Sequence, residues 1–164
     1  SMEKESMTKD VLVSISGMHE EILAVTPDVE EDENEAIEVV TPATYYLKNG
    51  KHYIVYEEVV EGTSGVIKNR IKINGDECVE IVKSGLSNSH MIFEKNKKNQ
   101  TFYKTPYGQM LIGVNTRCLQ VDFEEDKIAV QIDYELDVNH EPMADCKIRM
   151  NIVSKDSGKF SVLS

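Results

Sequence analysis

Residues that commonly bind metals or carry out catalysis are scattered along this chain and form no recognisable motif. The four histidines are isolated from one another and from cysteine: His19, His52, His90 and His140. No two of them lie one helical turn apart, and no close-set Cys or His pair has the ligand spacing of a zinc site. The spacing therefore predicts no metal site and no cofactor.

Motifs for covalent catalysis and nucleotide binding are also missing from the sequence. The chain has no Gly-x-Ser-x-Gly elbow, which would present a serine nucleophile at a strand-to-helix turn. It also lacks a glycine-rich loop whose backbone N–H groups could surround a phosphate. We therefore expect no catalytic residues and predict that the protein is not an enzyme.

The cysteines and the hydropathy pattern indicate a reducing compartment. Cys78, Cys118 and Cys146 are widely spaced, whereas a secreted disulfide framework favours an even number of cysteines. Each falls on the apolar phase of an expected strand, so we predict three buried free thiols. No run approaches the ~20 apolar residues of a membrane span, and the N-terminus has no apolar signal segment. We expect a cytoplasmic protein without a membrane partner.

The chain is acidic, with 18 Lys and Arg residues against 29 Asp and Glu residues and a formal net charge of −11. Residues 28–38 contain seven of these acids and no Lys or Arg. Like charges repel and such a composition buries little apolar surface, so residues 28–34 are predicted to form a mobile loop. Shortening this loop should leave the melting temperature within a few degrees.

One basic surface stands out against this acidity. Lys68, Arg70 and Lys72 alternate along an expected strand, so they project from one face. The candidates to join them after folding are Lys83, Lys95, Lys97, Lys98 and Lys104. The surface is either a site for phosphate or nucleic acid or the solvent face of a hairpin. Because the net negative charge weakens non-specific binding to nucleic acid, the second interpretation is favoured and no nucleic-acid partner is expected.

Apolar and polar residues alternate along most of the chain, which predicts β-strands with one buried face. In the clearest run the apolar residues, expected to face inward, are Ile128, Val130, Ile132, Tyr134, Leu136 and Val138. Turn signals such as Asn49-Gly50 separate the runs and favour sequential antiparallel pairing. The expected strands cover residues 10–16, 37–47, 52–60, 66–73, 77–83, 90–94, 101–105, 109–123, 128–138 and 146–152.

Two irregularities indicate that the sheet curls. The apolar phase of the run 109–123 slips by one residue around 116–118, which predicts a β-bulge. Pro42 interrupts another run and is expected at an edge or a bulge. We therefore predict an all-β fold, a single antiparallel barrel of about ten strands. The barrel should span residues 10–154, with an N-terminal tail (1–9) and a C-terminal tail or edge strand (155–164).

A distinctive short motif follows one of these strands, Tyr103-Lys104-Thr105-Pro106-Tyr107-Gly108. It predicts a strand end and a tight turn, because proline fixes φ and glycine permits positive φ. Thr116 and Tyr134 lie near the phase slip and should interrupt the inner apolar surface. The candidate ligand-binding residues are therefore Tyr103, Thr105, Tyr107, Thr116 and Tyr134. The structural alternative is that these side chains pack across the core and bond to the backbone.

Further short motifs occur in order along the chain: Ser84-Gly85, Met91-x-Phe93, the Tyr103–Gly108 motif, Thr116-x-x-Leu119 and Tyr134-x-Leu136. Together they resemble the YwiB-like proteins, small bacterial proteins common in Firmicutes and of unknown function. The resemblance covers residues 11–153 and implies a calycin/lipocalin-like antiparallel β-barrel in a bacterial cytoplasm. It provides no catalytic residues that could be transferred to this chain.

Two functions therefore remain open. The barrel could bind a small apolar ligand in its interior and at the mouth near residues 103–108. Alternatively, it is an interaction module with a filled core, whose surface binds a protein partner or a second copy of the chain. An interior cavity on the order of a few hundred Å³ would favour the first function, and a filled core the second.

Overall fold

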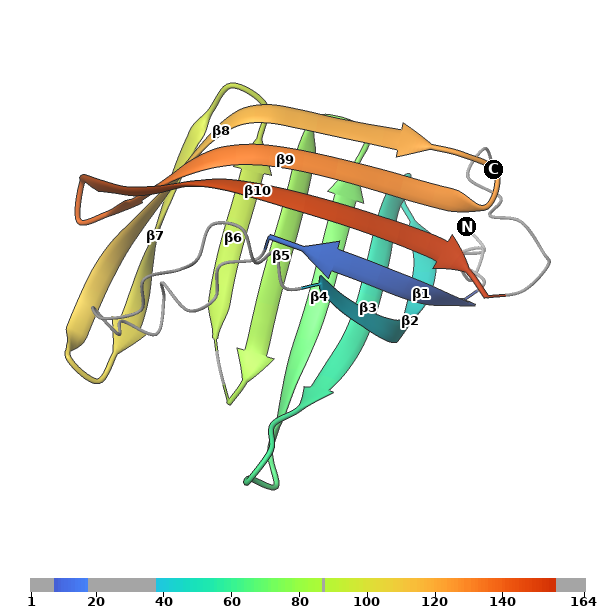
Figure 1. Ribbon diagram of the computed structural model, residues 1–164, viewed down its shortest axis with the longest axis horizontal. Helices are drawn as coiled ribbons and strands as arrows, with labels where there is room; N and C mark the ends of the chain where they lie inside the picture. The colour runs from blue at the N-terminus through green and yellow to red at the C-terminus, as the bar shows by residue number, and fades with distance from the viewer. Residues whose placement is uncertain (1–7, 18–37, 87, 156–164) are drawn as a thin grey trace.

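The computed structural model describes residues 8–17, 38–86 and 88–155, which form ten β-strands (Figure 1). The strands are β1 (Lys9–Ser16), β2 (Glu38–Lys48), β3 (Lys51–Val59), β4 (Val66–Asn74), β5 (Cys78–Gly85), β6 (Ser89–Glu94), β7 (Lys98–Thr105), β8 (Gly108–Phe123), β9 (Lys127–Val138) and β10 (Glu141–Ser154). They form one antiparallel sheet in the order β6-β5-β4-β3-β2-β1-β10-β9-β8-β7. None of the described residues forms a helix that is long and apolar enough to cross a membrane.

The sheet curls into a nearly closed barrel whose two edges are β6 and β7 (Figure 1). These edges are consecutive in the chain, so the short turn between them holds them together at one end. β8, β9 and β10 cross β3–β6 steeply, and the two groups of strands pack through their inner faces (Figure 1). The core between them includes Ile54, Phe93, Ile132 and Ile148. The prediction of an all-β antiparallel barrel is confirmed.

β9 confirms the alternation on which that prediction depended. Its residues from Ile128 to Leu136 on the apolar phase are buried, and Val138 packs against the core while half-buried. The predicted bulge in β8 is also confirmed, because the register with β9 shifts between Thr116 and Cys118. β8 consequently bends, beginning beside β7 and then running along β9 (Figure 1).

Some expectations for single side chains are wrong. Phe102, despite its apolar side chain, lies on the outer phase of β7 and is largely exposed. All three cysteines are free, but only Cys146 is buried, whereas Cys78 and Cys118 are half-buried. Cys118 directly follows the bulge, where the phase reverses and Leu119 takes the inward position.

Parts of the chain lie outside the described residues. They include the predicted acidic loop at 28–34 and most of both predicted tails. The expectations for these segments therefore stay predictions. The strands themselves run from Lys9 to Ser154.

Replacing Ile132 with aspartate should unfold the protein. Ile132 is fully buried in the middle of β9, and an unpaired carboxylate there costs about 4 kcal/mol or more, comparable with the whole stability of many domains. Far-UV circular dichroism and urea denaturation would measure the loss. Gln131→Asp, at the neighbouring position on the opposite face, is the matched control and should remain folded. A folded Ile132→Asp protein with a normal urea midpoint would contradict the inward placement.

Candidate functional site

β2 and β3 pair over only part of their length. Thr44 pairs with Val55, and the ladder continues from this pair toward the hairpin that joins the two strands. In the other direction, β2 stays paired with β1 as far as Glu38, while β3 stays paired with β4 as far as Val59. The two strands therefore diverge beyond Thr44 and Val55 (Figure 1).

Pro42 lies just beyond the last paired residue of β2. It pairs with Leu12 of β1 and has no pairing partner in β3. A proline has no backbone N–H to donate, so it is tolerated where a strand lacks a neighbour on one side. This confirms the expectation that Pro42 lies at a local edge, and it gives a sequence-based reason for the divergence.

An open cavity of about 670 Å³ lies at this divergence, and we call it the β2–β3 cleft. It is lined by Asp10, Pro42, Ala43, Thr44, Val55, Tyr56, Glu57, Lys68, Asn69, Arg70, Val82, Ser84 and Lys155. By the alternation of the strands, Ala43, Tyr56 and Asn69 belong to the inner face, and the other strand residues belong to the outer face. The lining thus combines both faces of β3 and β4, as expected where the wall of a barrel opens.

Two cationic side chains of the cleft, Lys68 and Arg70, differ in their ion pairing from Lys72, which follows them on the same face of β4. Lys68 and Arg70 are exposed and have no ion-pair partner among the described residues, although Glu57 pairs with Lys68 in the strand register. Lys72, next on the same face, lies 3.7 Å from Glu80. The expectation that these three side chains share one face is confirmed, and two of the three line the cleft.

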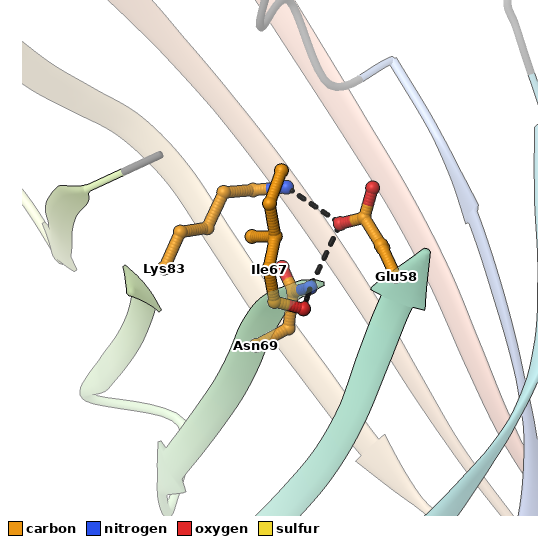
Figure 2. A network of polar contacts seen from close by, with 4 residues as sticks. All are labelled: Glu58, Ile67, Asn69 and Lys83. Carbon is orange, nitrogen blue, oxygen red and sulfur yellow. Dashed lines mark hydrogen bonds and ion pairs between the residues drawn. The ribbon is translucent and has the colours of Figure 1, made fainter. Parts of the chain in front are cut away.

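A polar network lies on the inner face beside the cleft (Figure 2). Glu58 Oε1 accepts hydrogen bonds from Lys83 Nζ at 3.0 Å and from Asn69 Nδ2 at 2.7 Å. Asn69 Nδ2 also lies 3.5 Å from the carbonyl oxygen of Ile67. These residues come from three consecutive strands, and Asn69 connects the network to the cleft lining. A buried ammonium group is tolerated here because a carboxylate neutralises it.

The expectation that Lys83 joins Lys68 and Arg70 on the outer surface is wrong. Lys83 follows Val79 and Ile81 on the inward phase of β5, and it is only 6% exposed. The sequence did contain the signal that finds this network. Glu58, Asn69 and Lys83 are polar residues on the apolar phase of three consecutive strands. Glu58 shares its phase of β3 with Ile54 and Tyr56, and Asn69 shares its phase of β4 with Ile71. A polar residue on that phase must find a buried partner.

Of the residues predicted to bind a ligand, two are brought directly together. Thr116 and Tyr134 are cross-strand neighbours, both buried, and the ring of Phe93 packs edge-on against Tyr134 with centroids 4.9 Å apart. Tyr103 is half-buried and packs against the same core. Tyr107 is 89% exposed in the turn, and Thr105 ends β7 directly before that turn. Tyr103, Tyr107, Thr116 and Tyr134 are not among the residues that line the β2–β3 cleft.

Two polar atoms near Tyr134 lack a hydrogen-bond partner among the described residues. They are Thr116 Oγ1 and Asn99 Nδ2, both shielded from solvent. Asn99 pairs with Val114 on β8, two residues before Thr116, so both lie on the same side of the barrel. Buried polar atoms are normally satisfied, so this region has room in its hydrogen bonding for a water or a ligand group. Its residues thus remain candidates.

A third polar contact lies near the hairpin that joins β2 and β3. Tyr45 Oη lies 2.7 Å from His52 Nδ1, and the ring of Phe123 packs on His52 with centroids 4.8 Å apart. Burial raises the pKa of Tyr45 to about 12 and lowers the pKa of His52. Both side chains are therefore neutral near pH 7, and the imidazole tautomer sets the direction of the hydrogen bond between them.

The described residues contain no group of three or more His, Cys, Asp or Glu side chains placed to hold a metal ion. The polar side chains at the described sites provide hydrogen-bond donors, acceptors and charged groups, and their apolar neighbours provide van der Waals contact.

Comparisons with known proteins agree with this architecture. The family model for a domain of unknown function, DUF1934, matches residues 23–150. The uncharacterized beta-barrel protein YwiB of Bacillus subtilis (strain 168) is 31% identical over 120 residues, which are 73% of this chain and 82% of that protein. The crystal structure of ywiB protein from Bacillus subtilis superimposes with a TM-score of 0.69 and 19% identity, over 92% of this chain and 96% of that chain. The superposition includes more of the chain than the sequence alignment does, and it shows a shared fold.

Glu58→Ala should destabilise the protein by about 1–2 kcal/mol. A fully buried ion pair would cost more to break, but the Glu58 side chain is 38% exposed and partly screened by water. Urea denaturation would measure the change in the free energy of unfolding. Glu124→Ala removes the exposed partner of Lys127 and serves as the control, with a change within about 0.5 kcal/mol. Equal effects of the two substitutions would mean that the inner network is not coupled to folding.

The stability of the protein should fall as the pH is lowered from 7 to 5.5. The folded state lowers the pKa of His52, so the unfolded chain binds the proton more readily. The contribution of His52 is fully present above its unfolded pKa of about 6.5 and is lost as the pH falls below that value. His52→Leu should reduce this pH dependence, measured by urea denaturation at both pH values. His140→Asn, in an exposed turn, should retain it. An unchanged slope in His52→Leu would contradict the assignment.

Proposed function

Since this chain belongs to the YwiB-like family, with the domain of unknown function DUF1934, we propose its function from its geometry: it binds a small molecule in the β2–β3 cleft. One observation carries the proposal. A cavity of about 670 Å³ lies at a defect in the barrel wall, and this volume is in the range of small-molecule sites, about 300–1,000 Å³. The site is larger than a structural water would need.

The composition of the lining supports a ligand with an apolar body. Pro42, Ala43, Val55, Tyr56 and Val82 contribute apolar surface, and the remaining residues contribute polar groups around it. Ligand sites commonly combine an apolar surface with a few polar groups that orient the ligand. The sequence analysis expected an apolar ligand in the barrel interior and near residues 103–108, whereas this proposal places the ligand in the β2–β3 cleft and gives it a polar group as well.

We propose further that the protein is a non-enzymatic binding protein of the bacterial cytoplasm. Among the described residues that line the cleft there is neither His nor Cys, so the serine and threonine hydroxyls have no imidazole base beside them within that set. The free thiols Cys78, Cys118 and Cys146 are typical of a reducing compartment.

A protein partner is the second candidate, supported by an exposed apolar surface on β2, β1 and β10. Leu12 pairs with Val153 in the register, and Val40 lies two residues from Pro42 on the same face of β2. These apolar side chains are partly exposed on one outer face, where contiguous apolar area favours association. Val40→Glu should abolish any dimer or complex seen by size-exclusion chromatography, without changing the binding of a small molecule.

The test of the proposed function is a thermal-shift screen against a metabolite library, combined with native mass spectrometry of protein purified from a bacterial host. A ligand at about 100 times its Kd stabilises the folded state by about 2.7 kcal/mol, or roughly 5–10 °C for a domain of this size. Val55→Trp places a bulky ring in the cleft and should abolish the shift.

The matched control is Val153→Trp, an outward valine of β10 that does not line the cleft. It should bind the ligand as the unsubstituted protein does. If every ligand that shifts the midpoint also shifts it in Val55→Trp, the cleft is not the binding site. If native mass spectrometry and the complete library find no ligand, the second candidate function takes its place.

A further inference from the structure

Arg70, which lines the β2–β3 cleft, and Lys72, which follows it on the same face of β4, differ in the residues that flank them in the sheet. Arg70 has apolar residues on both sides in the sheet, because its register partners are Val55 on β3 and Val82 on β5. No carboxylate therefore flanks it within its row. Lys72, one step along the same face, has Glu80 as its register partner on β5 and lies within ion-pair distance of it. The same strand face thus carries one neutralised cation and one without a carboxylate partner among the described residues.

Polar groups that can bind an anion gather around Arg70 on the outer face. Lys68 lies two residues away on the same face, and its register partner on β5 is Ser84. Directly paired residues of antiparallel strands have Cβ atoms about 4.5–5.5 Å apart, so the lysine and the serine hydroxyl are neighbours. Lys68, Arg70 and Ser84 all line the cleft. Together they provide an ammonium, a guanidinium and a hydroxyl on one surface.

The charge of the cleft also differs in sign from that of the protein. Among the described residues its lining holds three cations, Lys68, Arg70 and Lys155, and two carboxylates, Asp10 and Glu57, so their formal charge is 3 − 2 = +1. All the described residues together carry 16 Lys and Arg and 18 Asp and Glu, or 16 − 18 = −2. Glu57 is the register partner of Lys68 and offsets part of its charge, which leaves Arg70 as the principal cation.

We propose that the β2–β3 cleft selects an amphiphilic anion, a small molecule with an apolar body and one carboxylate or phosphate group. The anionic group binds Arg70, with Lys68 and Ser84 as additional donors, and the apolar body lies against Val55 and Val82. A guanidinium donates two parallel hydrogen bonds to a carboxylate or a phosphate, which fixes the orientation of the ligand. This inference rests on the proposed function and specifies its ligand class.

The experiment uses four ligands with the same eight-carbon chain: octanoate, octyl phosphate, octanol and octyltrimethylammonium. Binding to the full-length protein is measured by isothermal titration calorimetry below the micelle concentration. The two anions should bind at least about 10-fold more tightly than octanol, since a charge-assisted hydrogen bond is worth more than a neutral one. The cation should bind most weakly. The comparison of octanoate with octyl phosphate identifies which anionic group the site prefers.

The variants test which residue provides the selectivity. Arg70→Gln should weaken anion binding about 10-fold or more and leave octanol binding unchanged, and Lys68→Gln should have a smaller effect. Arg70→Lys should retain part of the affinity, since it keeps the charge and loses the paired hydrogen bonds. Lys72→Gln is the matched control, an outward lysine of β4 outside the cleft, and should bind like the unsubstituted protein. All three positions are on the outer face, and circular dichroism would check that the four variants fold.

The outcomes separate this inference from the proposed function. Equal affinity for octanoate and octanol, or no effect of Arg70→Gln, overturns the anion selectivity, while loss of binding in Val55→Trp would still support a site in the cleft. Failure of all four ligands to bind also overturns the inference, even if the metabolite screen finds a ligand of another class. Binding of the anions that is unaffected by Val55→Trp overturns both.

Discussion

Backbone hydrogen bonding between neighbouring strands is the constraint on which the rest of this structure depends. Every strand except β6 and β7 has a neighbour on both sides, and these two edges meet at a turn. A buried backbone group without a partner costs about as much free energy as a lost hydrogen bond, so a single sheet of this length curls on itself. The cavity lies where this ladder fails, beyond the pair formed by Thr44 and Val55. The candidate site is therefore a local exception to the interaction that builds the barrel.

The interior of the barrel is apolar in its middle and polar toward both ends of β3. His52 bonds to Tyr45 near one end of this strand, and Glu58 binds Lys83 near the other. Glu58 lies six positions after His52, which is about 20 Å along a strand. Ile54 is buried between them. A polar group near the end of a barrel keeps some contact with water, so its burial costs less there than in the middle.

The alternation of β4 places an amide side chain on the inner face of the sheet and two cationic side chains on the outer face. Asn69 points inward and bonds to Glu58, while Lys68 and Arg70 point outward. In an unbroken wall these groups would face different environments and could not line one space. Because the strands diverge at Pro42, the inner and outer faces meet in one cleft. The end of the β2–β3 pairing next to Pro42 thus coincides with a cleft that is lined by side chains of β1, β3, β4 and β5 as well as β2.

The sequence by itself determined the secondary structure and most of the burial. A strand has a side-chain period of two, so the alternation from Ile128 to Val138 predicted both β9 and its inner face. The bulge in β8 and the edge position of Pro42 were also predicted, since each depends on local backbone geometry. Apolar type alone does not determine the phase of a short strand, as the exposed Phe102 of β7 shows.

Only the tertiary structure decided which residues share a site. The cleft combines residues from five strands with Lys155, and the distances between them depend on how the sheet curls. Lys83 was assigned to the outer surface by its charge, whereas its inward phase and its partner Glu58 emerge only when β3, β4 and β5 lie side by side. The alternation of a strand predicts which of its side chains lie on the same face of the sheet. It does not predict which side chains of other strands those side chains contact. Strand pairing and curvature decide that, through contacts between residues far apart in the chain.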